Sequence, residues 1–438
     1  MKTKKITQDK VNVITLGCSK NQVDSENLIA QLEAGKYDVV HDSDQEANIV
    51  IINTCGFIGD AKEESINTIL SYADAKSSGE LDKLYVTGCL SERYKGELAQ
   101  EIPEVDAWFG TLELPALLRK FNVDYKHELL GHRKPVNPGH FAYLKIAEGC
   151  TRTCAFCAIP LMRGAHISRE IQDIVDEAMF LAQKGIKELI LISQELTFYG
   201  LDLYKERMLP QLLEKLVQIN GIEWIRLHYT YPGKFPIELI DVMAKHPKIC
   251  NYLDIPLQHG NDQVLDRMNR NTTVNDARKV VAYARKQIPD IAIRTTFIVG
   301  FPGETEDEFQ DLLDFVQEME FDRVGVFQYS HEEDTRAYIM KDDVPADLKA
   351  DRASQLMEIQ QEISLRKNIE KVGKVLKVLF DRKEGDYFIG RTEFDSPEVD
   401  NEVLIPADSN FIRVGDFANV KITDAEEFDL YGELYLTR

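Results

Sequence analysis

The amino-acid sequence of 438 residues predicts an α/β protein built from several domains. Short apolar runs alternate with helical patterns over residues 1–125, which predicts a doubly wound parallel sheet. A second series of this kind fills residues 141–345 and predicts a full or partial parallel βα barrel. Over residues 372–438, short strands are separated by glycine and proline, a pattern typical of a small antiparallel β-barrel.

Two connecting segments separate these three domains. The periodicity fades over residues 126–140, and the linker expected there contains Gly131, Pro135, Pro138 and Gly139. Residues 346–371 are charged and helical in pattern, so we expect a helix between the two barrels.

The expected elements follow from the spacing of apolar residues. In the first domain we expect strands at 11–16, 39–40, 49–52 and 84–87, and helices at 25–32 and 62–73. In the second we expect strands at 143–146, 188–193, 224–227, 252–255, 293–299 and 324–328, and helices at 171–183 and 274–285. The expected strands of the tail are 375–380, 387–391, 402–405, 417–422 and 431–436.

Composition excludes several protein classes. Hydrophobic residues make up 44% of the chain and charged residues 29%, which suits a globular protein and argues against disorder or a coiled coil. No apolar run approaches the roughly 18 residues of a membrane span. The basic start, Met1 to Lys5, is followed by an apolar run at 11–17 that is too short for a signal peptide. We therefore expect a cytoplasmic protein without a membrane partner.

The charge balance bears on the partner. The chain has 52 Lys and Arg against 74 Asp and Glu, a net charge of −22. Such a field repels phosphate backbones, so nucleic acid is not expected as the primary partner, and it attracts basic proteins. Solubility alone is the simpler explanation of an acidic composition.

The seven cysteines indicate metal or redox chemistry. Their number is odd and the chain is long, so a disulfide framework is not expected. Cys150, Cys154 and Cys157 follow the first expected strand of the barrel, and three thiolates on a tight loop suit three corners of a 4Fe–4S cluster. The fourth iron is then open to another ligand. Zinc with His166 as a fourth ligand is the alternative.

Three further cysteines end strands of the first domain. Cys18, Cys55 and Cys89 each come just after an apolar strand and just before a helix. In a parallel sheet these positions share one edge, where ligands collect, so we expect a second cluster with one open iron. Three buried structural cysteines are the alternative. Cys250 fits neither set and is interpreted as structural.

The barrel cysteines carry a resemblance to a known family. The C-x3-C-x2-C spacing after the first strand of a βα barrel resembles the signature of radical S-adenosylmethionine (SAM) enzymes. The resemblance implies that the open iron binds the methionine part of SAM and that reductive cleavage produces a radical that abstracts hydrogen. It also implies SAM contacts for Phe156, Gln194, Glu195 and Gly300. Ordinary core packing of Phe156 and a plain turn at Gly300–Gly303 are the alternatives.

The resemblance extends over nearly the whole chain to the radical SAM methylthiotransferases. It rests on residues 16–26, Asn53-Thr54-Cys55, Thr87-Gly88-Cys89, Arg163-Gly164, Ser168-Arg169, 252–259 and 300–305, and the tail resembles a TRAM domain. The resemblance implies that a methylthio group replaces hydrogen at a C–H bond. It implies two 4Fe–4S clusters, with SAM both as methyl donor and as radical source, and clusters that face each other across the substrate.

Two branches of this family differ in substrate. One modifies adenosine in transfer RNA (MiaB-like), and the other modifies the β-carbon of an aspartate in small-subunit ribosomal protein S-twelve (RimO-like). Residues 16–21 and 157–164 resemble the ribosomal-protein branch, and an acidic TRAM-like domain suits a basic ribosomal protein. The resemblance also implies a reductant and a sulfur source as partners.

Two alternatives and one departure from the family pattern stay open. The transfer-RNA branch is the alternative substrate, and a non-catalytic iron–sulfur protein that binds ribosomes or carries electrons is the alternative class. Asp334 stands where the family usually has glycine, so the local turn is in question. No catalytic role is expected for the histidines at 166, 228, 259 and 331, because hydrogen abstraction by a radical needs no general base.

Overall fold

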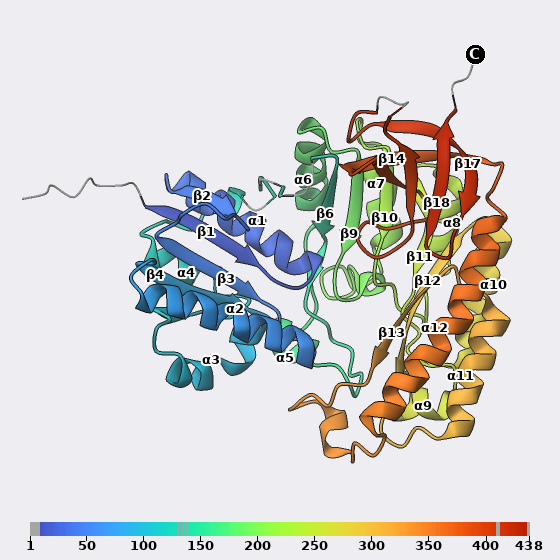
Figure 1. Cartoon of the computed structure of the whole chain (residues 1–438), viewed down its shortest axis with the longest axis horizontal. Helices are drawn as coiled ribbons and strands as arrows, with labels where there is room; N and C mark the ends of the chain where they lie inside the picture. Colours follow the sequence, from blue (N-terminus) through green and yellow to red (C-terminus); the bar gives the residue numbers. More distant parts are fainter. Residues whose placement is uncertain (1–8, 130, 134, 137–138, 409–411, 436–438) are drawn as a thin grey trace, which may run out of the picture. The chain divides into compact units, whose positions relative to one another are not determined.

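The computed structural model describes residues 9–129, 131–133, 135–136, 139–408 and 412–435 (Figure 1). Parts of the expected linker at 126–140 and the start of the chain, Met1 to Lys5, therefore lie outside the described residues. The chain divides into two compact units. The first comprises Met1–Val136, Ala147–Arg152 and Ala158–Phe180, and the second comprises Asn137–Ile146, Thr153–Cys157 and Leu181–Arg438. The boundaries of the five segments expected from the sequence stay predictions.

The first unit contains a five-stranded parallel sheet in the order β2-β1-β3-β4-β5. Its strands are β1 (Lys10–Thr15), β2 (Asp38–His41), β3 (Ile49–Thr54), β4 (Lys83–Gly88) and β5 (Ala107–Trp108). Its helices are α1 (Ser19–Ala34), α2 (Gly59–Ser77), α3 (Cys89–Glu101) and α4 (Leu114–Lys120), with a 3₁₀ turn η1 (His127–Leu129). The predicted doubly wound sheet is confirmed.

The central strand β3 shows why this sheet needs helices on both faces. All six of its residues are buried. Ile49 and Ile51 pack in a core with residues of α1 and α4, whereas Val50 and Ile52 pack in a second core with residues of α2 and α3. An apolar run without alternation is what a strand covered on both faces requires.

The rest of the first unit follows the first barrel strand along the chain. These elements are β7 (Ala147–Glu148), α5 (Ile159–Arg163), β8 (Ile167–Ser168) and most of α6 (Ile171–Gln183). Arg133 is buried between Glu26 of α1 and Glu177 of α6, with its Nε 2.8 Å from a Glu177 oxygen. Two carboxylates compensate one buried guanidinium here, and Arg169 also binds Glu177.

The second unit contains an open six-stranded parallel sheet in the order β13-β12-β11-β10-β9-β6. Its strands are β6 (Phe141–Lys145), β9 (Glu188–Ile192), β10 (Trp224–Leu227), β11 (Ile249–Asp254), β12 (Ala292–Val299) and β13 (Arg323–Gln328). Between them lie η2 (Leu196–Phe198), α7 (Leu209–Leu216), α8 (Glu238–Lys245), α9 (Asp262–Arg267), α10 (Val274–Gln287) and α11 (Glu306–Met319). The barrel is therefore partial, which was one of the two forms expected.

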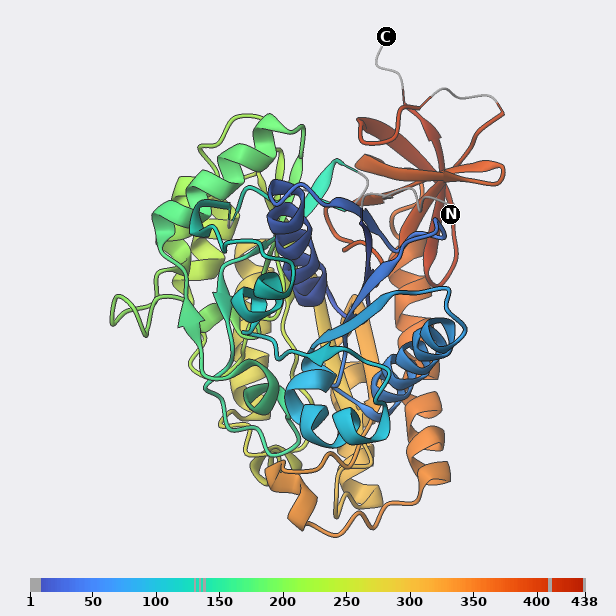
Figure 2. The same cartoon turned by 90° about the vertical axis from the view of Figure 1, so that its left-hand side faces the viewer.

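A long helix and a closed barrel complete the second unit. After η3 (Arg336–Ile339), helix α12 (Ala346–Ile369) runs along the sheet and ends at the closed barrel, as Figure 2 shows in orange and red. The barrel strands are β14 (Val375–Glu384), β15 (Tyr387–Thr392), β16 (Glu402–Pro406), β17 (Phe417–Ala425) and β18 (Asp429–Leu434). Residue 436, where the last expected strand ends, lies outside the described residues.

The small barrel differs from the expectation in one pairing. Its strand order is β14-β15-β16-β18-β17, and β16 pairs with β18 in parallel, whereas the other pairs are antiparallel. A ring with an odd number of strands cannot alternate direction all the way round. The expected antiparallel barrel is thus confirmed except for the one parallel pair that closure of five strands demands.

The connection between β15 and β16 joins the small barrel to the large sheet. Arg226 of β10 donates to the carbonyl of Glu393 at 2.8 Å, and Arg323 of β13 donates to Asp395 at 3.1 Å. Arg294 of β12 and Tyr252 of β11 both contact Asp400. Because most of these side chains are buried, the small barrel is an integral part of the second unit.

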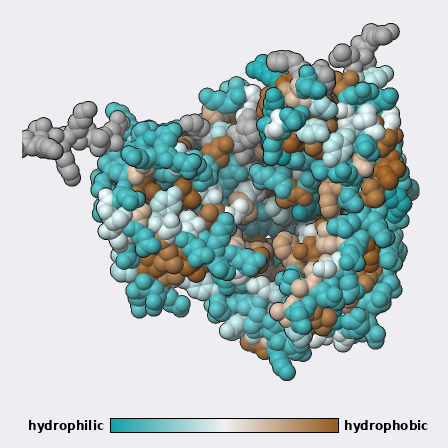
Figure 3. Space-filling view, in the orientation of Figure 1, coloured by the Kyte–Doolittle hydropathy of each residue, from teal (hydrophilic) through white to brown (hydrophobic). Residues whose placement is uncertain are grey.

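Surface character agrees with the composition. The face drawn in Figure 3 is mainly hydrophilic, with apolar side chains in separate patches. Among the described residues, no helix is both long enough and apolar enough to cross a membrane.

Candidate functional site

Three cysteines lie at one edge of the sheet in the first unit. Cys18 precedes α1, Cys55 follows β3 directly, and Cys89 is the first residue of α3 after β4. Strands β1, β3 and β4 are neighbours and parallel, so their carboxyl ends share this edge. Cys18 is exposed, and the other two thiols are buried.

The three thiols are close enough to influence one another's charge. Burial raises the pKa of Cys89 to about 12, and the charges of Cys18 and Cys55 contribute to this rise. The pKa of Cys55 is raised by burial and by Cys18. Thiols in such a site give up their protons only when a positive charge compensates them, and metal binding provides that charge. The donors therefore fit an iron–sulfur cluster.

Gly17 allows the turn before Cys18 to approach Cys55 closely. Its φ is +90°, and a Cβ at this position would lie 2.6 Å from the Cβ of Cys55. Any other residue would push the two loops apart.

The side chains of Asn21 and Arg163 connect the loops that carry Cys18, Cys55 and Cys89. The Asn21 amide donates to the carbonyl oxygens of Leu16 at 2.8 Å and Thr54 at 3.0 Å, and so joins the loops after β1 and β3. Its side-chain oxygen accepts a hydrogen bond from Arg163 of α5. The Arg163 guanidinium is also hydrogen-bonded to Cys89. Asn21 and Arg163 stand in segments that carry the family resemblance, but the sequence alone assigned them no role.

Cys150 belongs to the same unit. It is buried, and its backbone N–H donates to the carbonyl oxygen of Gly164 at 3.0 Å. Gly164 follows Arg163 directly, so one short segment contacts both Cys150 and the residues around Cys89.

Cys154 and Cys157 belong to the second unit and form a tight turn. The Cys157 N–H donates to the Cys154 carbonyl at 3.2 Å. The buried Arg270, which follows α9, places its Nη1 3.3 Å from the Cys154 sulfur. Burial lowers the pKa of Arg270, but Cys154 and Tyr231 outweigh burial and the net pKa is raised. Arg270 is thus a buried cation beside two thiols, and no short-range sequence pattern indicated it.

The residues expected to contact SAM lie in the second unit. Phe156 is half-buried and packs against a cluster that includes Phe301 and Tyr329. Gln194 and Glu195 follow β9, and the buried Glu195 carboxylate accepts a hydrogen bond from Thr197. These positions are at the carboxyl ends of strands, where parallel barrels bind ligands. The SAM contacts themselves stay predictions.

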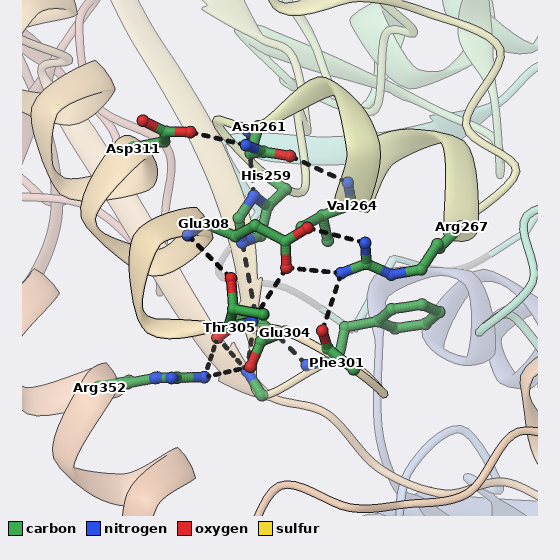
Figure 4. A network of polar contacts seen from close by, with 12 residues as sticks. His259, Asn261, Val264, Arg267, Phe301, Glu304, Thr305, Glu308, Asp311 and Arg352 are labelled. Carbon is green, nitrogen blue, oxygen red and sulfur yellow. Dashed lines mark hydrogen bonds and ion pairs between the residues drawn. The ribbon is translucent and has the colours of Figure 1, made fainter.

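Gly300 is held by a polar network around Glu304, and Figure 4 shows Glu304 with its neighbours His259 and Arg352. Both oxygens of Glu304 accept from the Gly300 N–H at 3.0 Å, and Arg352 and His259 contact the same carboxylate. Burial raises the pKa of Glu304, but His259, the Gly300 N–H and Arg352 outweigh it, and the net pKa is lowered. The side chain of Lys349 occupies the space that a Cβ on Gly300 would need. The Gly300–Glu304 loop is therefore fixed by residues of α12, and His259 is part of that structural network.

The alternatives to cluster binding, zinc with His166 and buried structural cysteines, stay predictions alongside it. Among the described residues, no group of three or more His, Cys, Asp or Glu side chains is arranged to hold a metal ion. A single zinc ion would bring its ligands within about 4 Å of one another, because Zn–S distances are about 2.3 Å. The His166 side chain contacts Ser168 at 3.1 Å. Cys250 is buried among Trp224, Tyr252 and Leu379, as its structural interpretation expects.

Three family descriptions match separate parts of the chain. They are the Radical SAM superfamily over residues 144–316, the Uncharacterized protein family UPF0004 over residues 10–110 and the TRAM domain over residues 372–434.

Full-length relatives decide the family. A protein of Christiangramia forsetii described as ribosomal protein uS12 methylthiotransferase RimO is 58% identical to this chain, and the match covers 99% of the chain and 96% of the relative. The protein of the same description from Flavobacterium johnsoniae is also 58% identical, with 99% and 100% coverage. The chain belongs to the RimO family of methylthiotransferases. It is therefore a radical SAM methylthiotransferase by family, and uS12 in these descriptions is the S-twelve protein expected above.

Solved structures support the fold. The radical SAM methyltransferase TsrM of Kitasatospora setae superposes with a TM-score of 0.53 at 15% identity, over 74% of this chain and 75% of that chain. The cobalamin-dependent radical SAM enzyme OxsB gives 0.52 at 12% identity, over 81% and 56%. Membership of the RimO family rests on the sequence relatives, whereas these structures bear on architecture alone.

Proposed function

We propose that this protein adds a methylthio group to the β-carbon of an aspartate in ribosomal protein uS12. The observation that carries the proposal is the 58% identity over the full chain with relatives described as uS12 methylthiotransferases. The same descriptions disfavour transfer RNA as substrate. A net charge of −22 agrees, because it opposes binding to a phosphate backbone and favours a basic ribosomal protein.

Six cysteines would hold two clusters in this proposal. Cys150, Cys154 and Cys157 would bind the 4Fe–4S cluster that meets SAM, and Cys18, Cys55 and Cys89 would bind a second one. When bound, the clusters and SAM supply the electron, the radical that abstracts hydrogen, and the methylated sulfur. The chain supplies charge compensation through Arg270 beside Cys154 and Arg163 beside Cys89. A reductant and a sulfur source complete the proposed set of partners.

The remaining residues of the site would hold SAM. Phe156 would pack near the adenine, and Gln194 and Glu195 would bind the methionine amino group. Gly300 would contribute to SAM binding through the position of its loop. Its own N–H would not take part, because that N–H already donates to Glu304.

The small acidic barrel is the proposed docking surface for uS12. Residues 372–438 contain eight Lys and Arg against fifteen Asp and Glu. On the hairpin that joins β17 and β18, burial and the neighbouring charges of Glu402 and Glu426 raise the pKa of Asp429. Such crowding of carboxylates is relieved when a cationic partner binds. The proposed place of action is the cytoplasm, where ribosomes are assembled.

Mass spectrometry of uS12 tests the proposal. In a host that lacks the gene, uS12 should lose the mass increment of SCH₃ in place of hydrogen, and the wild-type gene should restore it. A gene with Cys154→Ala should not restore it, and one with Cys250→Ala should. If the mass of uS12 is unchanged and transfer RNA loses the increment instead, the substrate of this protein is transfer RNA.

Cluster number needs a separate measurement. Iron and sulfide are measured after anaerobic reconstitution of the wild type and of two triple variants, one for each set of three cysteines. Each triple variant should hold half the iron of the wild type. If the variant of Cys18, Cys55 and Cys89 retains all of it, the second cluster does not exist.

A further inference from the structure

Arg163 is a buried cation at the edge that carries the three thiols of the first unit. Its side chain is 4% exposed. It ends the short helix α5, six residues after Cys157. Its guanidinium donates to Asn21 and is hydrogen-bonded to Cys89, and its charge also acts on Cys18 and Cys55.

Two carboxylates also bind Arg163. Asp24 lies 2.6 Å from Nη1 and Glu148 lies 3.3 Å from the same atom. The Asp24 side chain is 26% exposed and that of Glu148 is 17% exposed, so water screens both more than it screens the guanidinium. Of the charged groups that act on Cys89, Arg163 has the largest effect, and it lowers the pKa that burial raises.

Arginine keeps its charge at all physiological pH values. A fixed positive charge beside a metal cluster stabilises whichever redox state carries more negative charge. When a reductant gives one electron to a 4Fe–4S cluster, no bond breaks and the cluster becomes more negative by one charge. A cation at the position of Arg163 therefore favours the reduced state.

We propose that Arg163 raises the reduction potential of the cluster held by Cys18, Cys55 and Cys89. The inference rests on the proposed function, because that function places a cluster on these thiols. Arg163 acts through charge and position and is a positioning residue, with no contact to substrate assigned to it. Loss of its charge should make the second cluster harder to reduce without removing any of its ligands.

The test isolates the second cluster. Cys150, Cys154 and Cys157 are all replaced by alanine, so that the thiols of the other set are the only proposed ligands left. In this background Arg163, Arg163→Lys and Arg163→Gln are compared after anaerobic reconstitution. Iron and sulfide contents are measured first, and the midpoint potential is then followed by electron paramagnetic resonance during a mediated titration. Reconstitution and potential are both readouts independent of catalysis.

The expected result is a graded shift. Arg163→Gln should have a more negative midpoint potential than the parent at equal iron content, and Arg163→Lys should lie between them because a point charge is kept and the forked hydrogen bonds are lost. Arg169→Gln is the matched control. It removes an arginine of the same unit that binds Glu177 at 2.6 Å, and it should leave the potential unchanged.

Two results would overturn the inference. One is an unchanged potential in Arg163→Gln with its iron retained. If that variant takes up no iron, Arg163→Lys decides, since loss of the forked hydrogen bonds should shift its potential in the negative direction at equal iron content and an unchanged potential contradicts the inference. If the parent background with Arg163 intact binds no iron, the second cluster of the proposed function fails as well, and this outcome is distinct from an unchanged potential.

Discussion

Arg352 of α12 binds Glu304 through a contact of 2.7 Å between Nη1 and Oε1, and both side chains are almost completely buried. The same carboxylate accepts the N–H of Gly300, and Lys349 of α12 fills the space beside that glycine. Helix α12 thus fixes the loop that follows β12. Its other end holds the closed barrel, because Ser364 and Asn368 donate to the carbonyl of Glu427. One helix therefore connects the barrel proposed to dock uS12 with a loop proposed to bind SAM.

Removal of Arg352 should release this loop. Arg352→Met leaves the Glu304 carboxylate buried beside a neutral side chain, and breaking a buried ion pair in this way costs about 3 kcal/mol. We expect this loss in urea unfolding and weaker binding of SAM in equilibrium titration. Arg366→Ala is the control on the same helix, because its pair with Glu320 is exposed and such pairs are worth about 0–1 kcal/mol. Equal stability of the two variants would contradict the prediction.

Lys371, just after α12, should make stability depend on alkaline pH. Burial, followed by the positive charge of Arg323, lowers the pKa of Lys371 from 10.5 to about 8. Between these values the unfolded chain binds more protons at this lysine than the folded chain, so its contribution to the free energy of unfolding rises with pH between about 8 and 10.5. Urea unfolding across this window should show a rise in the wild type relative to Lys371→Met.

The control for Lys371 is the neighbouring Lys374, which is exposed. Lys374→Met should follow the wild type at every pH. A pH profile of Lys371→Met that is parallel to the wild type would show that this lysine is charged to the same extent in both states.

The ion pair between Arg323 and Asp395 should stabilise the second unit. Both groups are buried, and Asp395→Asn leaves the guanidinium without its charge partner, at a cost of about 3 kcal/mol. We expect a lower thermal unfolding temperature in Asp395→Asn than in the wild type. We also expect its cooperative unfolding to be lost only at a higher denaturant concentration than in a variant that lacks residues 372–438. Glu402→Gln, at an exposed pair with Arg382, should change stability by about 0–1 kcal/mol. A stable protein that lacks residues 372–438 would show that the closed barrel is an independent module.

The two sets of cysteines should separate two steps of the reaction. Cys55→Ala removes a thiol of the first unit and should spare reductive cleavage of SAM while methylthiolation of uS12 is lost. Cys154→Ala should abolish both activities. The measurements are chromatography of 5′-deoxyadenosine and mass spectrometry of uS12 from the same reactions. Methylthiolation by Cys55→Ala at the wild-type rate would exclude a role for that set.

Asp334 adopts a left-handed backbone, with φ of +61°. The left-handed turn is thus formed with aspartate, which tolerates this region better than most residues. Asp334→Gly should change stability by less than about 1 kcal/mol, since the relief of strain and the added chain entropy oppose each other. Asp334→Val should cost about 1–2 kcal/mol in thermal unfolding, because a β-branched side chain is strained there.

Much of the fold could be predicted because it is recorded in short stretches of sequence. The unbroken apolar run of β3 marks a strand covered on both faces, and helix α6 was predicted with its observed bounds, Ile171–Gln183. Strand β5, with two residues, escaped prediction, and the helix expected after Cys89, observed as α3, was expected without bounds. Their positions depend on neighbouring strands more than on their own residues.

The sequence by itself determined which thiols are proposed to bind clusters, because the spacing of Cys150, Cys154 and Cys157 and the placement of Cys18, Cys55 and Cys89 after strands are both local features. Only the tertiary structure decided which charges surround these thiols and their loops. Arg163 meets Asp24 across 139 residues, and Arg352 meets Glu304 across 48. A lone arginine has no periodic pattern, and its partner is set by how distant strands and helices pack, so such contacts exist only once the chain has folded.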